Sequence, residues 1–540
     1  MSWICDGTPK NGQQYPNCSG PHPPYENNGP DCAICGLPQE AMQSAKTVVS
    51  SNGGKGGNFP LPILMLVAIA LLLLGGGSWW YFSQRGGDRT VVVENDSGNN
   101  SDGVPTSGVN PLAIVSETAV NAELISQGEK ILIIGGRNSQ EKTSAAAAFA
   151  SQDWPGAIQQ YQEAVNKDKN DPEAAIYLNN AKAKQAGNPL TMAVVVPITT
   201  RVNEAKEVLR GVAQYQGEFN QVPSIPGRLL EVVVVNEKDA SLSDSLAEDL
   251  IQSSANVLGV IGHGVDNNSR QALTRYEQNN LAVLSPLNTT ISTNAGQSTV
   301  QTIPLSQTKT ILTTYLQKVA ETLVNYAVKN HSPAKVTLFY NSDNRYSQDL
   351  KGELVSALSK AGATLVKEVD ILSPGFDATA EIDKARQAGS NIAFLALSKN
   401  QVDRAIALAQ ANQNQLVLLS SDEMYNPQIL VQGGDAIKGM VLAVPWRWRS
   451  NDPFASQAGK LWQGRVSWRT ATTYDATNAL ANAFTQFPGD RAAISQQLNQ
   501  GVTLTKTATE FNIFNEIPLV KANPGTAGPT GSKYQFDPIE

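Results

Sequence analysis

One uninterrupted apolar run stands out early in the chain, at residues 61–82, which read LPILMLVAIALLLLGGGSWWYF and carry no charge. A helix of about 20 apolar residues is long enough to cross a bilayer core, and it satisfies its own backbone hydrogen bonds. Trp79, Trp80 and Tyr81 stand near the end of the run, as aromatic residues do at a membrane interface. The pattern predicts a transmembrane helix at residues 61–82. A buried core helix and a cleaved signal segment are the alternatives.

A second pattern, in which short apolar runs alternate with amphipathic segments, fills residues 189–540. Residues 192–197 form the first run, as expected for a buried parallel strand. Further strands are expected at 229–235, 257–261, 281–285, 335–340, 364–369, 392–397 and 416–420, with helices at 202–219, 244–253, 270–278, 309–329, 348–361, 378–388 and 402–411. Repeated strand–helix units give parallel sheets with helices on both faces. The long helix at 309–329 separates two such sets, so we predict an α/β fold of two lobes around a cleft.

The chain between the apolar run and the body divides into two parts. Residues 83–115 are rich in Gly, Asn, Ser and Asp, and are predicted to be a solvated, disordered linker. Residues 116–187 are predicted to be helical, with helical signals that begin near Glu117. Ala157, Tyr161, Ala164 and Pro172 resemble one tetratricopeptide repeat with extra residues before the proline. One repeat is too short for a solenoid, so the helices dock on the body or a partner, or form a simple spacer.

Charge and histidine content narrow the function classes. The 540 residues carry a net charge of −7 without a basic stripe, so nucleic acid is not an expected partner. The chain has only three histidines and shows no Gly-x-Ser-x-Gly, His-Glu-x-x-His or P-loop motif. We therefore expect a binding protein rather than an enzyme, with no cofactor in the body.

All four cysteines, Cys5, Cys18, Cys32 and Cys35, lie within residues 1–40. Four thiolates can complete a tetrahedral zinc shell, and a Cys-x-x-Cys turn points two sulfurs at one ion. So small a segment has almost no apolar core, and metal binding would supply its folding free energy. We predict a zinc-binding head at 1–40 and a flexible link at 41–60. A disordered tail with free or paired cysteines, or a redox pair at Cys32 and Cys35, remains open.

Residues 27–38, which read NNGPDCAICGLP, together with the early Trp3, resemble a Ran-binding-protein-type zinc finger. The wide separation of Cys5 and Cys18 departs from the second tight knuckle of that family, so its RNA- and protein-binding roles are not carried over. Zinc ligation requires reduced thiols. We therefore expect a single-pass protein of the cytoplasmic membrane with a cytoplasmic head and a periplasmic or extracellular body.

Polar residues follow the predicted strands of the body, where ligands bind in such sheets. Short hydroxyls and backbone N–H groups hold anionic groups, and a carboxylate on the opposite lobe holds an ammonium. The pairing suits a small zwitterion such as an amino acid. The candidate ligand-binding residues are Asp266, Ser285, Asn288, Thr289, Tyr346 and Asp422.

Six short motifs are spread over the body. They are Val194-Val195-Val196-Pro197, Val260-Ile261-Gly262-His263, Val283-Leu284-Ser285-Pro286, Leu338-Phe339-Tyr340 with Tyr346, Ser420-Ser421-Asp422 and Tyr474-Asp475-Ala476. Together they resemble the leucine/isoleucine/valine-type (type I) periplasmic binding proteins of ABC transporters. The resemblance implies a two-lobed clamshell that binds a small solute without changing it. It also implies that Thr289 holds the ligand carboxylate, that Tyr346 lines the cleft and that Asp422 meets the ligand ammonium.

Two positions depart from that family. Asp266 stands where a small hydroxyl is usual, and it would repel a ligand carboxylate unless a cation intervened. Residues 397–400, Leu-Ser-Lys-Asn, stand where the family often supplies an aromatic residue. Branched-chain amino acids are therefore doubtful ligands, and another amino acid, an amide or a polyol-like solute is an alternative.

We predict a membrane-anchored extracytoplasmic protein that captures an amino-acid-like solute for an ABC-type importer and its permease. The alternative is a ligand-sensing or scaffold receptor that uses the zinc-like head for protein contacts. A third reading is a body whose cleft has lost its ligand, as Asp266 suggests. The cluster Trp446-Arg447-Trp448-Arg449 either stacks on a ligand or belongs to the surface or a hinge.

Overall fold

The computed structural model describes residues 3–10, 25–27, 32, 35–42, 113–253, 256–264, 267–286, 288–294, 297–504, 506–508, 517–529 and 531–539. The predicted transmembrane helix at 61–82 lies outside these residues, as do nearly all of the predicted link and linker on either side of it. Among the helices of the described part, none is both long and apolar enough to cross a membrane.

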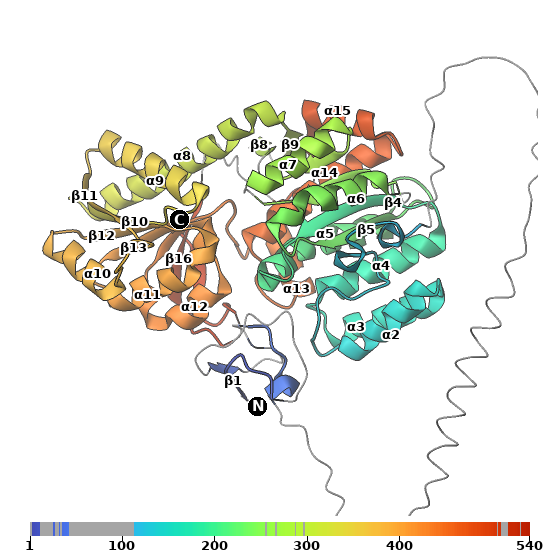
Figure 1. The fold of residues 1–540 in the computed structure, drawn as a ribbon, viewed down its shortest axis with the longest axis horizontal. Helices are drawn as coiled ribbons and strands as arrows, with labels where there is room; N and C mark the ends of the chain where they lie inside the picture. Colours follow the sequence, from blue (N-terminus) through green and yellow to red (C-terminus); the bar gives the residue numbers. More distant parts are fainter. Residues whose placement is uncertain are drawn as a thin grey trace, which may run out of the picture. The chain divides into compact units, whose positions relative to one another are not determined.

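The first lobe is built on a sheet with the strand order β3-β5-β4-β6-β7. Figure 1 labels β4 and β5 of this sheet. Strands β4 and β5 are buried along their whole length, which explains why both read as continuous apolar runs. The parallel strands are β4 (Leu190–Val196), β5 (Leu230–Asn236), β6 (Gly259–Gly262) and β7 (Ala282–Leu284). Helices of this lobe are α5 (Val202–Gln221), α6 (Ser243–Gln252), α7 (Asn267–Gln278), α13 (Pro453–Leu461), α14 (Trp468–Gln486) and α15 (Arg491–Gln500).

The second lobe has its own sheet, with the strand order β11-β10-β12-β13-β14-β16-β17. Its parallel strands are β10 (Lys335–Tyr340), β11 (Thr364–Asp370), β12 (Ile392–Ala396), β13 (Val417–Ser421) and β14 (Val441–Ala443). Its helices are α8 (Leu305–Asn330), α9 (Arg345–Lys360), α10 (Ala378–Gln387), α11 (Val402–Asn412) and α12 (Pro427–Gly433). The predicted strand–helix alternation is confirmed in both lobes, with ends that differ by a few residues.

Both sheets are mixed rather than parallel throughout, which corrects the prediction. Strand β3 (Ile125–Ser126) pairs antiparallel with β5, and it is too short to show a period in the sequence. Strands β16 (Leu519–Pro524) and β17 (Tyr534–Pro538) continue the second sheet in the antiparallel sense. The sequence analysis also missed a small sheet of β8 (Thr289–Asn294), β9 (Gln297–Thr302) and β15 (Val502–Leu504).

Three helices precede β4, namely α2 (Ser139–Ala150), α3 (Trp154–Lys167) and α4 (Pro172–Ala186). The expected helical start near Glu117 is wrong, because the chain there forms two short 3-10 helices and then β3. Asp153 and Asp171 cap α3 and α4 by accepting hydrogen bonds from backbone N–H groups of the first turn.

These three helices share one apolar core with the first lobe. Phe149, Tyr161 and Tyr177 are fully buried in the same cluster as Met192 and Val194 of β4. Packing of this kind supplies most of the stability of a helix in a protein. The helices therefore dock on the body and form part of the first lobe.

The chain passes between the lobes after β9, where it enters α8, after β14 at residues 444–452, and after β15. The Trp446–Arg449 cluster lies on the crossing at 444–452, which supports the hinge interpretation of that motif.

Candidate functional site

A buried carboxyl group marks the carboxyl end of β13 in the second lobe. Asp422 is 5% exposed and begins the 3-10 helix Asp422–Met424. Its Oδ1 accepts hydrogen bonds from the hydroxyls of Tyr315 at 2.6 Å and Tyr346 at 3.2 Å. The structure thus brings together Tyr346 and Asp422, two of the predicted site residues. Tyr315 was missed, because a tyrosine on the long helix α8 gives no local sign of a distant carboxylate.

The surroundings of Asp422 make its charge costly. Burial and the neighbouring Glu423 raise the pKa of Asp422 to about 6, against the hydrogen bonds from Tyr315 and Tyr346 and the attraction of Arg469, which lower it. A ligand ammonium beside this group would favour its ionised form. The site is therefore suited to a positively charged group.

Three predicted residues of the first lobe form one turn after β7. The backbone N–H of Ser285 donates to Asn288 Oδ1 at 3.0 Å and to Thr289 Oγ1 at 2.9 Å. The Asn288 amide donates to the carbonyl of Val283 at 3.0 Å, and Asn288 is buried. Asn288 thus stabilises the turn, while Thr289 remains half-buried at its edge. Asp266, the remaining predicted ligand residue, lies outside the described residues.

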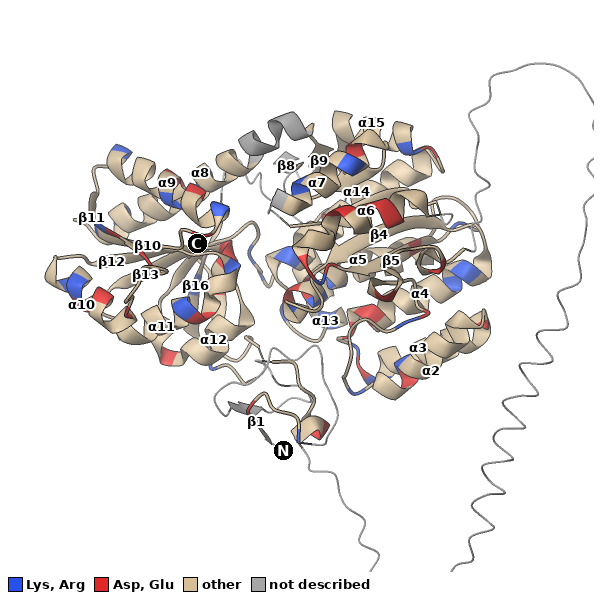
Figure 2. Ribbon diagram, viewed as in Figure 1, with Lys and Arg blue, Asp and Glu red and all other residues tan. Residues whose placement is uncertain are grey.

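An ionic cluster that the sequence analysis did not assemble joins the lobes. Glu204, in the first turn of α5, lies 3.3 Å from Lys399 Nζ of the second lobe and 3.0 Å from Arg201 Nε. Figure 2 colours the basic and acidic positions along the ribbon, and both kinds occur near the label of α5. Burial alone would raise the pKa of Glu204, but Lys399, Arg469 and Arg201 together lower it to about 2. Lys399 belongs to the segment where the resembled family often has an aromatic residue. Here Lys399 forms an ion pair with Glu204 instead.

Arg469 of α14 makes a further contact between the lobes. This buried side chain donates from Nη1 to the carbonyl of Tyr425 at 3.1 Å, and the same nitrogen lies 3.3 Å from Glu207 Oε2 of α5. Its sequence signal was a single arginine among small and apolar residues in a helix, a position that usually indicates a charge with a buried partner. Glu204, Lys399 and Arg469 therefore place charge where the lobes meet.

Three predicted metal ligands of the head also come together. The Sγ atoms of Cys5, Cys32 and Cys35 all lie within 4.8 Å of one another, and those of Cys5 and Cys35 are 3.6 Å apart. Sulfurs bound to one tetrahedral zinc ion are about 3.8 Å apart, so the set fits zinc. Cys18, the fourth predicted ligand, lies outside the described residues.

The local backbone of the head supports these sulfurs. Strand β1 (Trp3–Cys5) pairs antiparallel with β2 (Tyr25–Asn27). The N–H of Gly7 donates to Cys5 Sγ at 3.3 Å, and Gly7 has φ 75°, a left-handed conformation that favours glycine. Burial raises the pKa of Cys5 to about 11, and a hydrogen bond with Cys32 together with burial raises that of Cys35 far above its usual range. A cation would be needed to hold all three as thiolates.

Comparison with known proteins agrees with this architecture. The sequence profile of the family described as "Periplasmic binding protein" matches residues 189–516. A comparison with curated protein sequences finds no match.

Solved structures with a similar fold include a branched-chain amino acid transporter substrate-binding protein from Streptococcus pneumoniae in complex with isoleucine. It is 13% identical, covers 65% of this chain and 99% of its own, and has a TM-score of 0.50. An ABC transporter substrate-binding protein from Sphaerobacter thermophilus is 16% identical, covers 65% and 97%, and also has a TM-score of 0.50. Because the matched residues 189–516 make up more than half of the chain and contain most of both lobes, the chain belongs to the periplasmic binding protein family.

Proposed function

We propose that this protein is a membrane-anchored, extracytoplasmic solute-binding protein that captures an amino-acid-like molecule for an ABC-type importer. The observation that carries the proposal is the buried Asp422, bound by the hydroxyls of Tyr315 and Tyr346 at a strand end of the second lobe. A carboxyl group whose pKa is raised by burial gains most from a partner that brings a positive charge.

In the proposed complex, the ligand ammonium meets Asp422, and Tyr346 lines the same part of the cleft. The ligand carboxylate meets Thr289 and the neighbouring Ser285 of the first lobe. Asn288 holds the turn that carries Thr289. Asp266 is the residue that would oppose a bare carboxylate. Closure of the lobes then buries the solute without chemistry, as expected of a binding protein rather than an enzyme.

The ion pair of Lys399 and Glu204 favours a polar ligand over an aliphatic one. The two side chains are each 21% exposed and their charged atoms lie 3.3 Å apart. An aliphatic side chain beside them would displace water from both charges without replacing its hydrogen bonds. We therefore expect polar amino acids to bind more tightly than leucine or isoleucine.

A thermal-shift screen of the detergent-solubilised full chain against amino acids, amides and polyols tests the proposal. A ligand at 100 times its dissociation constant stabilises a protein by about 2.7 kcal/mol, so a true ligand raises the melting temperature measurably. Asp422→Asn should abolish the shift, while Asp383→Asn, which removes an exposed carboxylate paired with Arg386 on α10, should keep it. If no solute of these classes shifts the melting temperature, the solute-binding role is wrong.

The segment at 61–82 is the proposed anchor, with the head cytoplasmic and the body outside. Within the head, Cys5, Cys32 and Cys35 are the proposed zinc ligands, with Cys18 as the fourth. The three sulfurs that lie within 4.8 Å support this assignment. Zinc would supply the folding free energy that so small a segment lacks.

The cysteine cluster also favours a second candidate, a ligand-sensing or scaffold receptor. A metal-stabilised head is not needed for solute capture, but it suits contacts with another protein. Uptake of the identified solute by cells that lack the gene separates the two roles. An importer component loses uptake when the gene is deleted, whereas a receptor leaves uptake unchanged.

A further inference from the structure

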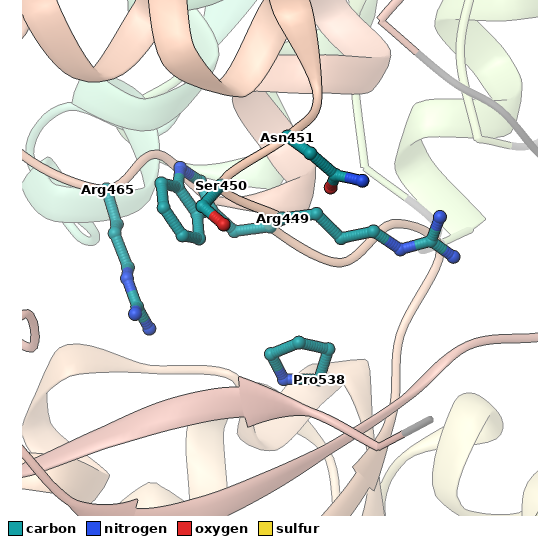
Figure 3. Close-up of a pocket in the computed structure, with 6 residues that line it drawn as sticks. Arg449, Ser450, Asn451, Arg465 and Pro538 are labelled. Carbon is teal, nitrogen blue, oxygen red and sulfur yellow. The ribbon is translucent and has the colours of Figure 1, made fainter.

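A pocket lies on the crossing at residues 444–452. It encloses about 330 Å³ and is lined by Trp448, Arg449, Ser450, Asn451, Arg465 and Pro538 (Figure 3). We propose that this pocket binds a small solute that carries oxyanion groups, such as a phosphate or a di- or tricarboxylate. None of the six lining residues belongs to the proposed amino-acid site, so the proposal does not depend on that site.

The lining of the pocket contains basic side chains that suit an anion. Two of its six residues are arginines, and the lining residues within the described part of the chain include no acid. Figure 3 shows the Arg449 and Arg465 side chains along two different walls, with Pro538 across from both. A guanidinium presents five N–H donors in one plane, a geometry that matches carboxylate and phosphate oxygens.

Arg465 is held in place before any ligand arrives. Its guanidinium carbon lies 4.4 Å from the ring centroid of Trp448, and its Nη1 lies 2.9 Å from Asp537 Oδ1. The ring and the carboxylate restrict its rotamers, so less side-chain entropy is lost when an oxyanion binds. Asp537 offsets part of the charge of Arg465. Arg449 is the second arginine of the lining.

The rest of the lining suits a small polar ligand. Ser450 and Asn451 are exposed and offer a hydroxyl and an amide at the crossing, while Trp448 and Pro538 supply apolar surface. A volume of about 330 Å³ is at the lower end of the range for ligand pockets. These features indicate a compact solute rather than a polymer.

Because of the position of the pocket, a bound anion would favour one arrangement of the two lobes. Arg449 comes from the crossing, Arg465 follows α13 of the first lobe, and Pro538 ends β17 of the second lobe. A ligand that touches all three binds one arrangement of the lobes more tightly than others. By linkage, the anion changes the affinity of the main cleft for its solute, and the solute changes the affinity of the pocket for the anion by the same factor.

Isothermal titration of the full chain with inorganic phosphate and with citrate, at constant ionic strength, tests the proposal. We expect saturable binding of at least one anion, with Arg449→Gln weakening it tenfold or more. Arg386→Gln removes an exposed arginine paired with Asp383 and should leave the affinity unchanged. The two titrations distinguish a phosphate site from a carboxylate site.

Two further variants keep the outcome decisive. Asn451→Asp adds a negative charge to the rim without removing an arginine, and should weaken binding even if Arg449→Gln does not fold. Asp422→Asn should leave anion binding intact, so failure of the amino-acid site is distinguishable from failure of this one. Absence of saturable binding of both anions, or equal affinity in the Asn451→Asp variant, would overturn the proposal.

Discussion

At the scale of single residues, the chemistry of the second lobe depends on how Asp422 is held. Tyr315 and Tyr346 donate to one of its oxygens, but burial and Glu423 still raise its pKa to about 6. The two hydroxyls therefore stabilise the carboxylate only in part. The remaining cost is what a ligand ammonium would remove.

Because burial disfavours the ionised form of Asp422, the free energy of unfolding of the protein should depend on pH. The carboxyl of Asp422 releases its proton near pH 3.8 in the unfolded chain and near pH 6 in the folded one. Between these values the folded state holds more protons, so the contribution of Asp422 to stability falls as pH rises from about 4 to about 6. Relative to Asp422→Asn, the wild-type chain should lose about 3 kcal/mol over that window.

Denaturant unfolding of both proteins at pH 4 and pH 7 measures this difference. Other groups, including Glu204 with its lowered pKa, cancel because they are common to the two proteins. A difference that stays constant between the two pH values would show that Asp422 titrates near its ordinary pKa.

At the scale of elements, the helices before β4 are integrated into the first lobe by buried ions as well as by apolar packing. Lys142 of α2 lies 2.9 Å from Asp171 Oδ2 and 2.6 Å from Glu173 Oε2. Lys184 of α4 lies 3.0 Å from Glu231 Oε1 of β5. All five groups are buried, and buried charges are tolerated only when paired.

Lys142→Met should therefore destabilise the protein by about 3–5 kcal/mol, because it leaves two buried carboxylates without their cation. Lys167→Met is the matched control. Its partner is Glu141, and the two side chains are 46% and 21% exposed, so its loss should cost less than about 1 kcal/mol. Thermal and denaturant unfolding compare the two variants. Equal, small losses would mean that the buried ion cluster around Lys142 does not stabilise the lobe.

The head yields a prediction at the same scale. Full-length protein purified under reducing conditions should contain about one zinc per chain by elemental analysis, since the three sulfurs fit one tetrahedral ion. Cys35→Ser should lower the zinc content severalfold, whereas Ser116→Ala in the body should not. Metal-free wild-type protein that fails to take up added zinc would rule out the assignment.

At the scale of the whole molecule, side-chain contacts hold the two lobes together across the proposed cleft. Lys399 pairs with Glu204, and Arg469 donates to the carbonyl of Tyr425. Since these contacts form within the protein itself, they favour approach of the lobes before a solute binds. A ligand that enters between them must compete with the Lys399–Glu204 pair.

Lys399→Met should therefore shift the ligand-free protein towards separated lobes and increase its radius of gyration in small-angle scattering. Lys384→Met removes a lysine that pairs with Glu381 on one helix of the second lobe, and should change nothing. An unchanged radius of gyration in Lys399→Met would mean that the ion pair does not control closure.

Some elements of the fold were predictable from the sequence, and others were not. The buried strands β4 and β10 were predicted to within two residues, because continuous apolar runs are visible locally. The grouping of Cys5, Cys32 and Cys35 was expected from residue type. Strand β3, with two residues, and the polar hairpin β8–β9 were missed, because neither carries an apolar pattern.

The sequence by itself determined the strand–helix alternation and the two-lobe architecture, since short-range periodicity encodes them. The family resemblance singled out Tyr346 and Asp422 separately, and the hydrogen bond between them, 76 residues apart, came from the tertiary structure. Only the tertiary structure decided that Tyr315 contacts Asp422, 107 residues away, and that Lys399 contacts Glu204, 195 residues away. The physical reason is that periodicity depends on neighbours along the chain. Contacts between distant residues depend on how α8 packs on its sheet and on how the lobes meet.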